Sequence, residues 1–240
     1  MKKNTLLLSL GLIVLVSCST FTSRSVHGEG PLTKQQRTVG NFDQIQSFGS
    51  FDVSISSAET NSVKVEAEEN LQEFIEVVVD NNTLNIRQKR NYNIDSPHGI
   101  KITLFAPALR ALRLFGSGNV QTENRIPSPG QLEIESSGSG DIIYDLKAES
   151  LKAQLSGSGK MQLAGMANDV DAAINGSGNI KAKDLETNKT GIRISGSGNA
   201  EINVKEKLNL EINGSGDVRY WGSPDVNTHI AGSGTVVKDN

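Results

Sequence analysis

The chain has 240 residues and a formal net charge of −3, from 24 Lys and Arg against 27 Asp and Glu. Because residues of both signs are interspersed, no basic region indicates nucleic acid or an anionic lipid surface as a partner. The single cysteine, Cys18, has no second cysteine with which to form a disulfide in this chain.

Residues 1–17 have the pattern of a lipoprotein signal peptide. Lys2 and Lys3 precede an apolar run over residues 6–16, which is far shorter than the about 20 residues that span a bilayer. Leu-Val-Ser-Cys at 15–18 resembles the lipobox of bacterial lipoproteins, in which the cysteine is lipidated and becomes the mature N-terminus. We therefore predict lipidation of Cys18. The attached acyl chains would hold the protein on a membrane, since each buried methylene adds about 0.8 kcal/mol of membrane binding. The alternative is a simple secretory signal with an incidental cysteine.

Residues 18–36 are predicted to form a flexible tether, because this stretch is rich in Ser, Thr and Gly and lacks apolar periodicity. Residues 37–110 predict an N-terminal β section that caps one end of the domain following it. Asn81-Asn82 indicates a hairpin turn, and residues 68–74 a single helical turn. The predicted strands are Phe51–Ser56, Val63–Ala67, Ile75–Val79, Leu84–Gln88 and Ile100–Phe105.

Residues 111–240 are dominated by a repeated tripeptide, Gly-Ser-Gly. Its copies follow one another at 18 to 22 residues, which is typical of a chain that stacks one structural unit on its copies. All seven Phe lie at or before position 115, whereas 18 of the 24 Gly lie from Gly116 onward. The tripeptides begin at Gly116, Gly138, Gly157, Gly176, Gly196, Gly214 and Gly232. Gly49-Ser50-Phe51 resembles a degenerate copy.

Apolar residues alternate with polar ones on both sides of each tripeptide. In residues 208–220 the apolar side chains fall on even positions, and the two glycines, Gly214 and Gly216, have the same parity. A period of two predicts a strand with one buried face. The glycines therefore continue the buried face, where the backbones of neighbouring units can approach closely.

Two architectures fit this pattern. In a β-solenoid each unit of about 20 residues is one coil, and its strands pair in parallel with neighbouring coils. In a meander each tripeptide is a hairpin loop, and Asn175-Gly176 and Asn213-Gly214 resemble hairpin dipeptides. The other five units lack that Asn, so the turn chemistry is not what repeats. We therefore favour an all-β fold, a parallel β-solenoid with about 18–22 residues per coil behind an N-terminal β-rich cap.

The chain also resembles a known family. The segments 51–55 (FDVSI), 84–86 (LNI) and 112–114 (LRL), the last placed before Gly-Ser-Gly-Asn-Val, are similar to the bacterial "putative auto-transporter adhesin, head GIN domain" family, which is common in lipoproteins of Bacteroidetes. The resemblance covers residues 37–237. It implies a right-handed parallel β-helix and a cell-envelope location, and it supplies no catalytic residues.

The residues directly after the tripeptides are the first candidates for chemistry, and we call them the corner ladder. Glycine-rich repeats with Asp bind calcium in other proteins, but this period is longer and only two of the seven residues are Asp. We expect polar side chains that cap each corner, and no metal or cofactor. The ladder consists of Asn119, Asp141, Lys160, Asn179, Asn199, Asp217 and Thr235.

Catalysis finds little support in the sequence. Parallel β-helices often cleave polysaccharides, which needs two carboxyl groups about 5–9.5 Å apart. Asp141 and Asp217 lie four coils apart, about 19 Å at about 4.8 Å per coil. His27, His98 and His229 are widely separated and have no metal-ligand spacing. No Ser lies in a nucleophile elbow, so we expect no enzyme and no catalytic residue.

Trp221 is the only tryptophan and a weak candidate for ligand binding. Its parity places it on the outer surface, where it could stack on a sugar ring. The alternative is that Tyr220 and Trp221 cover a turn between the last two coils.

The leading functional hypothesis is a lipid-anchored, non-enzymatic envelope protein with an adhesin-like surface for a protein or glycan partner. A structural envelope component and a polysaccharide-acting enzyme are the alternatives. The outer membrane is the expected location, and the sequence leaves open the side of the membrane, the ligand and the oligomeric state.

Overall fold

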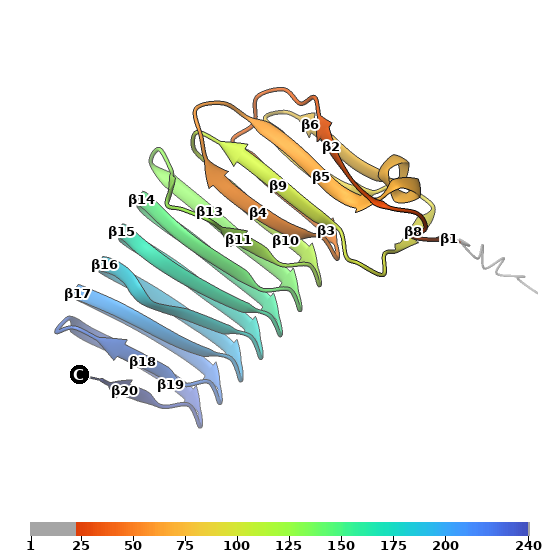
Figure 1. The fold of residues 1–240 in the computed structure, drawn as a ribbon. Coiled ribbons are helices and arrows are strands. Elements are labelled where there is room, and N and C mark those ends of the chain that lie inside the picture. Colours follow the sequence, from red (N-terminus) through yellow and green to blue (C-terminus); the bar gives the residue numbers. More distant parts are fainter. Residues whose placement is uncertain (1–22, 240) are drawn as a thin grey trace, which may run out of the picture.

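The computed structural model describes residues 23–239, which form a stack of β-coils (Figure 1). Strands one coil apart pair in parallel along the stack, from β3 (Gln44–Gly49) and β10 (Ala111–Gly116) to β20 (Val236–Lys238). This confirms the β-solenoid. A meander would pair strands across each tripeptide in antiparallel orientation, so the hairpin interpretation of the Asn-Gly pairs is wrong.

Each coil has two faces that meet at the tripeptide, which forms a corner. Strands on the pre-corner face run into the corner, and strands on the post-corner face leave it. The pre-corner face contains β3, β10, β13 (Gln131–Gly138), the second halves of the four long strands, and β19 (Asp225–Gly232). The post-corner face contains β4 (Asp52–Ser57), β11 (Val120–Thr122), β12 (Ile126–Pro127), the first halves of the long strands, β18 (Val218–Trp221) and β20. The long strands are β14 (Ile142–Gly157), β15 (Lys160–Gly176), β16 (Asn179–Gly196) and β17 (Asn199–Gly214).

The register aligns the first glycine of every corner with that of the next coil. Gly116 pairs with Gly138 on one side and with Gly49 on the other, so Gly49-Ser50-Phe51 occupies a corner, as predicted. The alternation of buried residues also agrees with the sequence pattern: Leu208 and Ile212 are fully buried. The core therefore runs between the two faces as far as Val218, whereas β19 in the last coil is largely exposed.

The corners are held by backbone hydrogen bonds between coils. The carbonyl oxygen of Gly176 accepts the N–H groups of Ser197 and Gly198 in the next coil, at 2.9 and 3.0 Å. Gly196 has a φ of 128°, in the left-handed region that favours glycine. Close approach of successive backbones is therefore the common property of the corners.

At the N-terminal end the stack is joined by antiparallel strands (Figure 1). β5 (Ser62–Glu68) pairs with β9 (Lys101–Ala106) and with β2 (Leu32–Arg37), and the hairpin of β6 (Ile75–Asp80) and β7 (Thr83–Gln88) extends the pre-corner face. Asn81 and Asn82 have φ values of 46° and 62°, which confirms the predicted turn. A 3₁₀ helix, η1 (Glu69–Phe74), matches the predicted helical turn.

The prediction of a flexible tether over residues 18–36 is wrong from Arg24 onward. β1 (Arg24–His27) pairs in parallel with β8 (Tyr92–Asp95), and β2 pairs along its whole length with β5. The polar composition of this segment suggested a flexible chain. However, β2 is an edge strand, and backbone hydrogen bonds to β5 order it although most of its side chains are exposed. Residues 1–22, including the signal peptide and Cys18, lie outside the described residues, and within residues 23–239 no helix is long and apolar enough to span a membrane.

Candidate functional site

Side chains of the corner ladder form hydrogen bonds between successive coils. Asn199 Oδ1 accepts the backbone N–H of Asp217 at 2.9 Å, and Asp217 Oδ1 accepts the N–H of Thr235 at the same distance. Thr235 also donates its hydroxyl to Asp217, and this contact is the main cause of the lowered pKa of the Asp217 carboxyl. The ladder oxygens therefore serve as caps for the next coil.

A calcium ion would need about six to eight oxygen ligands at one place. The ladder offers one side chain per coil, and the hydrogen bonds between coils occupy its oxygens. Among residues 23–239 no group of three or more His, Cys, Asp or Glu side chains is placed to hold a metal ion.

Replacing Asn199 by Ala is expected to lower the free energy of unfolding by about 1 kcal/mol, because the N–H of Asp217 loses its acceptor. Lys160 provides the matched control, since its side chain caps nothing and the next N–H, of Asn179, bonds to the carbonyl of Gly159 at 3.2 Å. Lys160→Ala should change stability by less than about 0.5 kcal/mol. Urea denaturation measures both variants, and equal losses would show that the ladder contributes no stability.

The carboxylates of the pre-corner face are held in ion pairs. Arg113 contacts Glu133 and also Glu135, the latter at 3.7 Å, and Lys152 Nζ lies 3.2 Å from Glu133. Burial alone would raise the pKa of Glu133, but the bonds from Lys152 and Arg113 outweigh burial and lower it. A general acid for glycoside cleavage needs a raised pKa. Glu133 therefore lacks the protonation behaviour of such an acid.

The three histidines lie at separate places. His27 Nδ1 is 3.0 Å from Asp95, His98 Nδ1 is 2.9 Å from the buried carboxylate of Glu68, and His229 lies on β19. Ser96 donates to Glu68 rather than to His98. The Ser, His and carboxylate groups at this place are therefore not arranged for the serine to be activated as a nucleophile.

Trp221 ends β18 and pairs with Asn203, an outer position of the post-corner face. Its ring is half-buried, and Lys183 Nζ lies 4.4 Å from the ring centroid. A cation over the indole is a favourable contact by itself. Because the Lys183 ammonium group covers one face of the indole ring, Trp221 stays only a weak candidate for sugar stacking.

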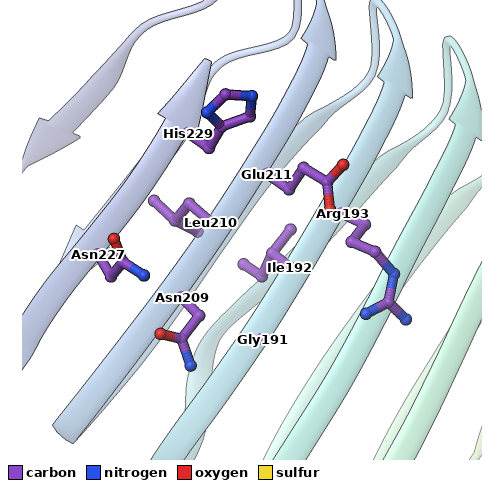
Figure 2. Close-up of a pocket in the computed structure, with 8 residues that line it drawn as sticks. All are labelled: Gly191, Ile192, Arg193, Asn209, Leu210, Glu211, Asn227 and His229. Atoms are coloured by element: carbon purple, nitrogen blue, oxygen red, sulfur yellow. The ribbon is translucent and has the colours of Figure 1, made fainter. Parts of the chain in front are cut away.

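A shallow groove of 350 Å³ lies on the outer surface of the pre-corner face near its C-terminal end. Figure 2 shows that its residues come from three neighbouring strands, β16, β17 and β19. The groove exists because Gly191 has no side chain, while the residues paired next to it, Asn209 and then Asn227, project outward. His229 and Glu211 form one rim, so the groove offers amide, imidazole and carboxylate groups. Of the groove residues, the sequence analysis had considered only His229. A lone glycine within an alternating strand, here Gly191, is a sequence signal that could have indicated the groove.

A stacked pair of aromatic rings, the exposed Phe48 and the half-buried Phe115, lies on the same face toward its other end. Phe48 and Phe115 pair across β3 and β10, and their ring centroids are 5.0 Å apart with an interplanar angle of 15°. Phe48 is 36% exposed. Sequence reasoning did not propose this pair, although both residues directly precede the first glycine of a corner.

Comparison with known proteins agrees with this architecture. Residues 41–224 match the family model described as "Putative auto-transporter adhesin, head GIN domain". Among solved structures, a "putative adhesin" from Bacteroides fragilis is 24% identical and has a TM-score of 0.83; the alignment covers 89% of this chain and 100% of that one.

Two structures from Parabacteroides distasonis are also 24% identical, with alignments that cover 90% of this chain and 100% of theirs. One is described as a "putative adhesin" (TM-score 0.74) and the other as a "Putative lipid binding protein" (TM-score 0.72). No curated protein matches the sequence. At this identity the structural likenesses show the fold.

Proposed function

Because this chain belongs to the auto-transporter adhesin, head GIN domain family, which its residues 41–224 match, we propose that it is a lipid-anchored envelope protein that binds a partner without catalysis. The lipid on Cys18 would attach it to the outer membrane. The solenoid would then present its pre-corner face to a protein or glycan.

The observation that carries this proposal is the pre-corner face itself. From β7 through β3 and β10 to β19, successive parallel strands present outward side chains in register, with a groove at one end and stacked aromatic rings toward the other. A continuous apolar core lies behind this face from Ile45 to Ile212, so the face is a rigid surface from β3 to β17. Rigid surfaces lose little conformational entropy when they bind, which favours recognition of extended partners.

The side-chain chemistry favours binding over turnover. The carboxylates of Glu133 and Asp171 are engaged by cations, Glu133 by Arg113 and Lys152 and Asp171 by Arg193. The ladder oxygens cap backbone groups. The proposal therefore assigns no catalytic residue and no cofactor.

The anchor is tested by Cys18→Ser. We expect the wild-type protein in the membrane fraction and the variant in the soluble fraction, because removal of the thiol removes the site of acylation. Ser17→Ala leaves the thiol in place and serves as the control. Retention of Cys18→Ser in the membrane after a high-salt wash would contradict the lipid anchor.

Partner binding is tested by protease treatment of intact cells followed by an adhesion assay. If the protein faces outward and acts as an adhesin, treatment should degrade it, and a deletion strain should bind less to immobilised host proteins and glycans. Equal binding by wild-type and deletion strains would contradict the adhesin role. A weakened envelope in that strain would then favour the structural alternative.

A further inference from the structure

The stacked ring pair of the pre-corner face consists of the exposed Phe48 and the half-buried Phe115. Phe48 and Phe115 stack on one another at a centroid distance of 5.0 Å, so Phe48 covers one face of the Phe115 ring. The opposite face of Phe115 points toward the next strand, β13, where its register partner is Ser137. A serine side chain is too short to cover a whole phenyl ring, so its register partner does not stack on this second face of Phe115.

Small side chains continue one coil further. Ser137 pairs with Ser156 on β14, so two small side chains follow Phe115 in the same column. Neighbouring strands lie about 4.8 Å apart, close to the separation of the two phenyl rings. A flat ring placed above Ser137 would therefore continue the stack at its existing spacing, with Phe115 as wall and the two serines as floor. We call this space the Ser137 shelf.

The side of the shelf away from the corner is polar. The adjacent outward column carries Arg113, Glu135 and Gln154, paired in register on β10, β13 and β14. Arg113 is half-buried and is oriented by its ion pairs with Glu133 and Glu135. These groups offer planar donors and acceptors at fixed positions beside an apolar wall. They also compensate one another in charge, so the rim attracts neither a strong anion nor a strong cation.

We propose that the Ser137 shelf binds a neutral pyranose sugar, stacked through its C–H face on Phe115. A pyranose ring has an apolar face of axial C–H groups and a rim of hydroxyls, which matches a phenyl wall beside Arg113, Glu135 and Gln154. An aromatic peptide side chain would fit the wall but would cover these polar groups without hydrogen-bonding them. An acidic sugar would lie beside Glu135, while Arg113 is already paired.

This inference rests on the proposed partner-binding function and specifies its ligand. The test uses the purified full-length protein and four probes: maltotriose, cellotriose, tri-N-acetylchitotriose and trigalacturonate. NMR of the protein with labelled Phe follows the seven Phe rings, of which Phe48 and Phe115 should shift on saturation. We expect at least one neutral trisaccharide to bind and trigalacturonate to bind at least tenfold more weakly.

Ser137→Trp fills the shelf without removing Phe115 and should weaken binding at least tenfold. Ser195→Trp is the matched control, because Ser195 occupies the same column three coils further along and should leave affinity unchanged. Phe115→Ala supplies a second variant and should also weaken binding at least tenfold. Phe105→Ala is its control, because Phe105 lies on β9, which pairs with β4 of the post-corner face. Thermal unfolding verifies that each variant is folded.

Three results would overturn the inference. They are no saturable shift of Phe115 with any neutral probe, an unchanged affinity of both folded Ser137→Trp and Phe115→Ala, or binding of trigalacturonate as tight as that of the neutral trisaccharides. If the wild-type cells still adhere better than the deletion strain, only the sugar site fails. If that adhesion difference is also absent, the adhesin role fails with it.

Discussion

Gly198→Ala is expected to lower the free energy of unfolding by at least about 2 kcal/mol. A Cβ at this position would lie 2.2 Å from the carbonyl oxygen of Gly178 and 2.6 Å from Ile174 Cγ2, both in the preceding coil. These contacts are with backbone and a buried side chain, so neither can move without opening the stack. Overpacking of a well-packed core costs about 1–3 kcal/mol, and the clash with a backbone oxygen places this variant at the upper part of that range.

Gly196→Ala should be at least as damaging. Its Cβ would lie 2.4 Å from the carbonyl oxygen of Gly176, and its φ of 128° is strained for any other residue. That carbonyl accepts two N–H groups of the Gly196 coil, so displacement would also break backbone hydrogen bonds. Because each coil stabilises its neighbours, the loss should appear as reduced stability of the adjoining coils.

Gly191→Ala is the matched control, in a strand of the same coil. The nearest atom to its added Cβ is Asp171 Oδ1 at 3.9 Å, which is ordinary contact. Since Ala also restricts the unfolded chain, this variant should be neutral or more stable by about 0.5 kcal/mol. Guanidinium denaturation followed by circular dichroism compares the three variants. Equal stability of Gly198→Ala and Gly191→Ala would mean that the corners tolerate a side chain.

The second large effect concerns Glu68, a carboxylate that is 1% exposed. Burial by itself raises its pKa, but hydrogen bonds from Ser96, from the His98 ring and from backbone N–H groups outweigh burial and lower the pKa from 4.5 to about 2. A lowered pKa in the folded protein means that folding favours the ionised carboxylate. This contribution is complete above pH 4.5 and is lost as the pH falls from 4.5 to about 2.

Glu68→Gln should therefore destabilise the protein by about 3 kcal/mol at neutral pH, since each unit of pKa shift corresponds to about 1.4 kcal/mol. In the wild-type protein this amount should disappear between pH 4.5 and 2, whereas the variant should lack that component. Glu66→Gln is the control, because Glu66 pairs with the exposed Lys34 on the surface. The measurement is denaturant unfolding at several pH values. Parallel pH profiles for wild type and Glu68→Gln would contradict the role of Glu68.

The sequence predicted the repeats correctly but predicted a flexible tether where β1 and β2 form, because different interactions order the two regions. The repeats were recognisable because their side-chain alternation reports burial directly. β1 and β2 have few buried side chains, and their order comes from backbone pairing with β8 and β5, which leaves little trace in composition. The sequence also did not reveal the partners of His27 and His98. Asp95 approaches His27 through the pairing of β1 with β8, and Glu68 lies near His98 because β5 pairs with β9.

The sequence by itself determined the coil length, the parity of the buried residues and the position of every corner. These are local properties, repeated in each unit, and the glycines are required wherever one backbone must approach the next. Only the tertiary structure decided which outward side chains meet. Phe48 and Phe115 stack because β3 lies beside β10, although β4 to β9 intervene in the chain and divert it through the antiparallel strands. The Ser137 shelf therefore follows from strand register across coils, which alternation within a single strand does not encode.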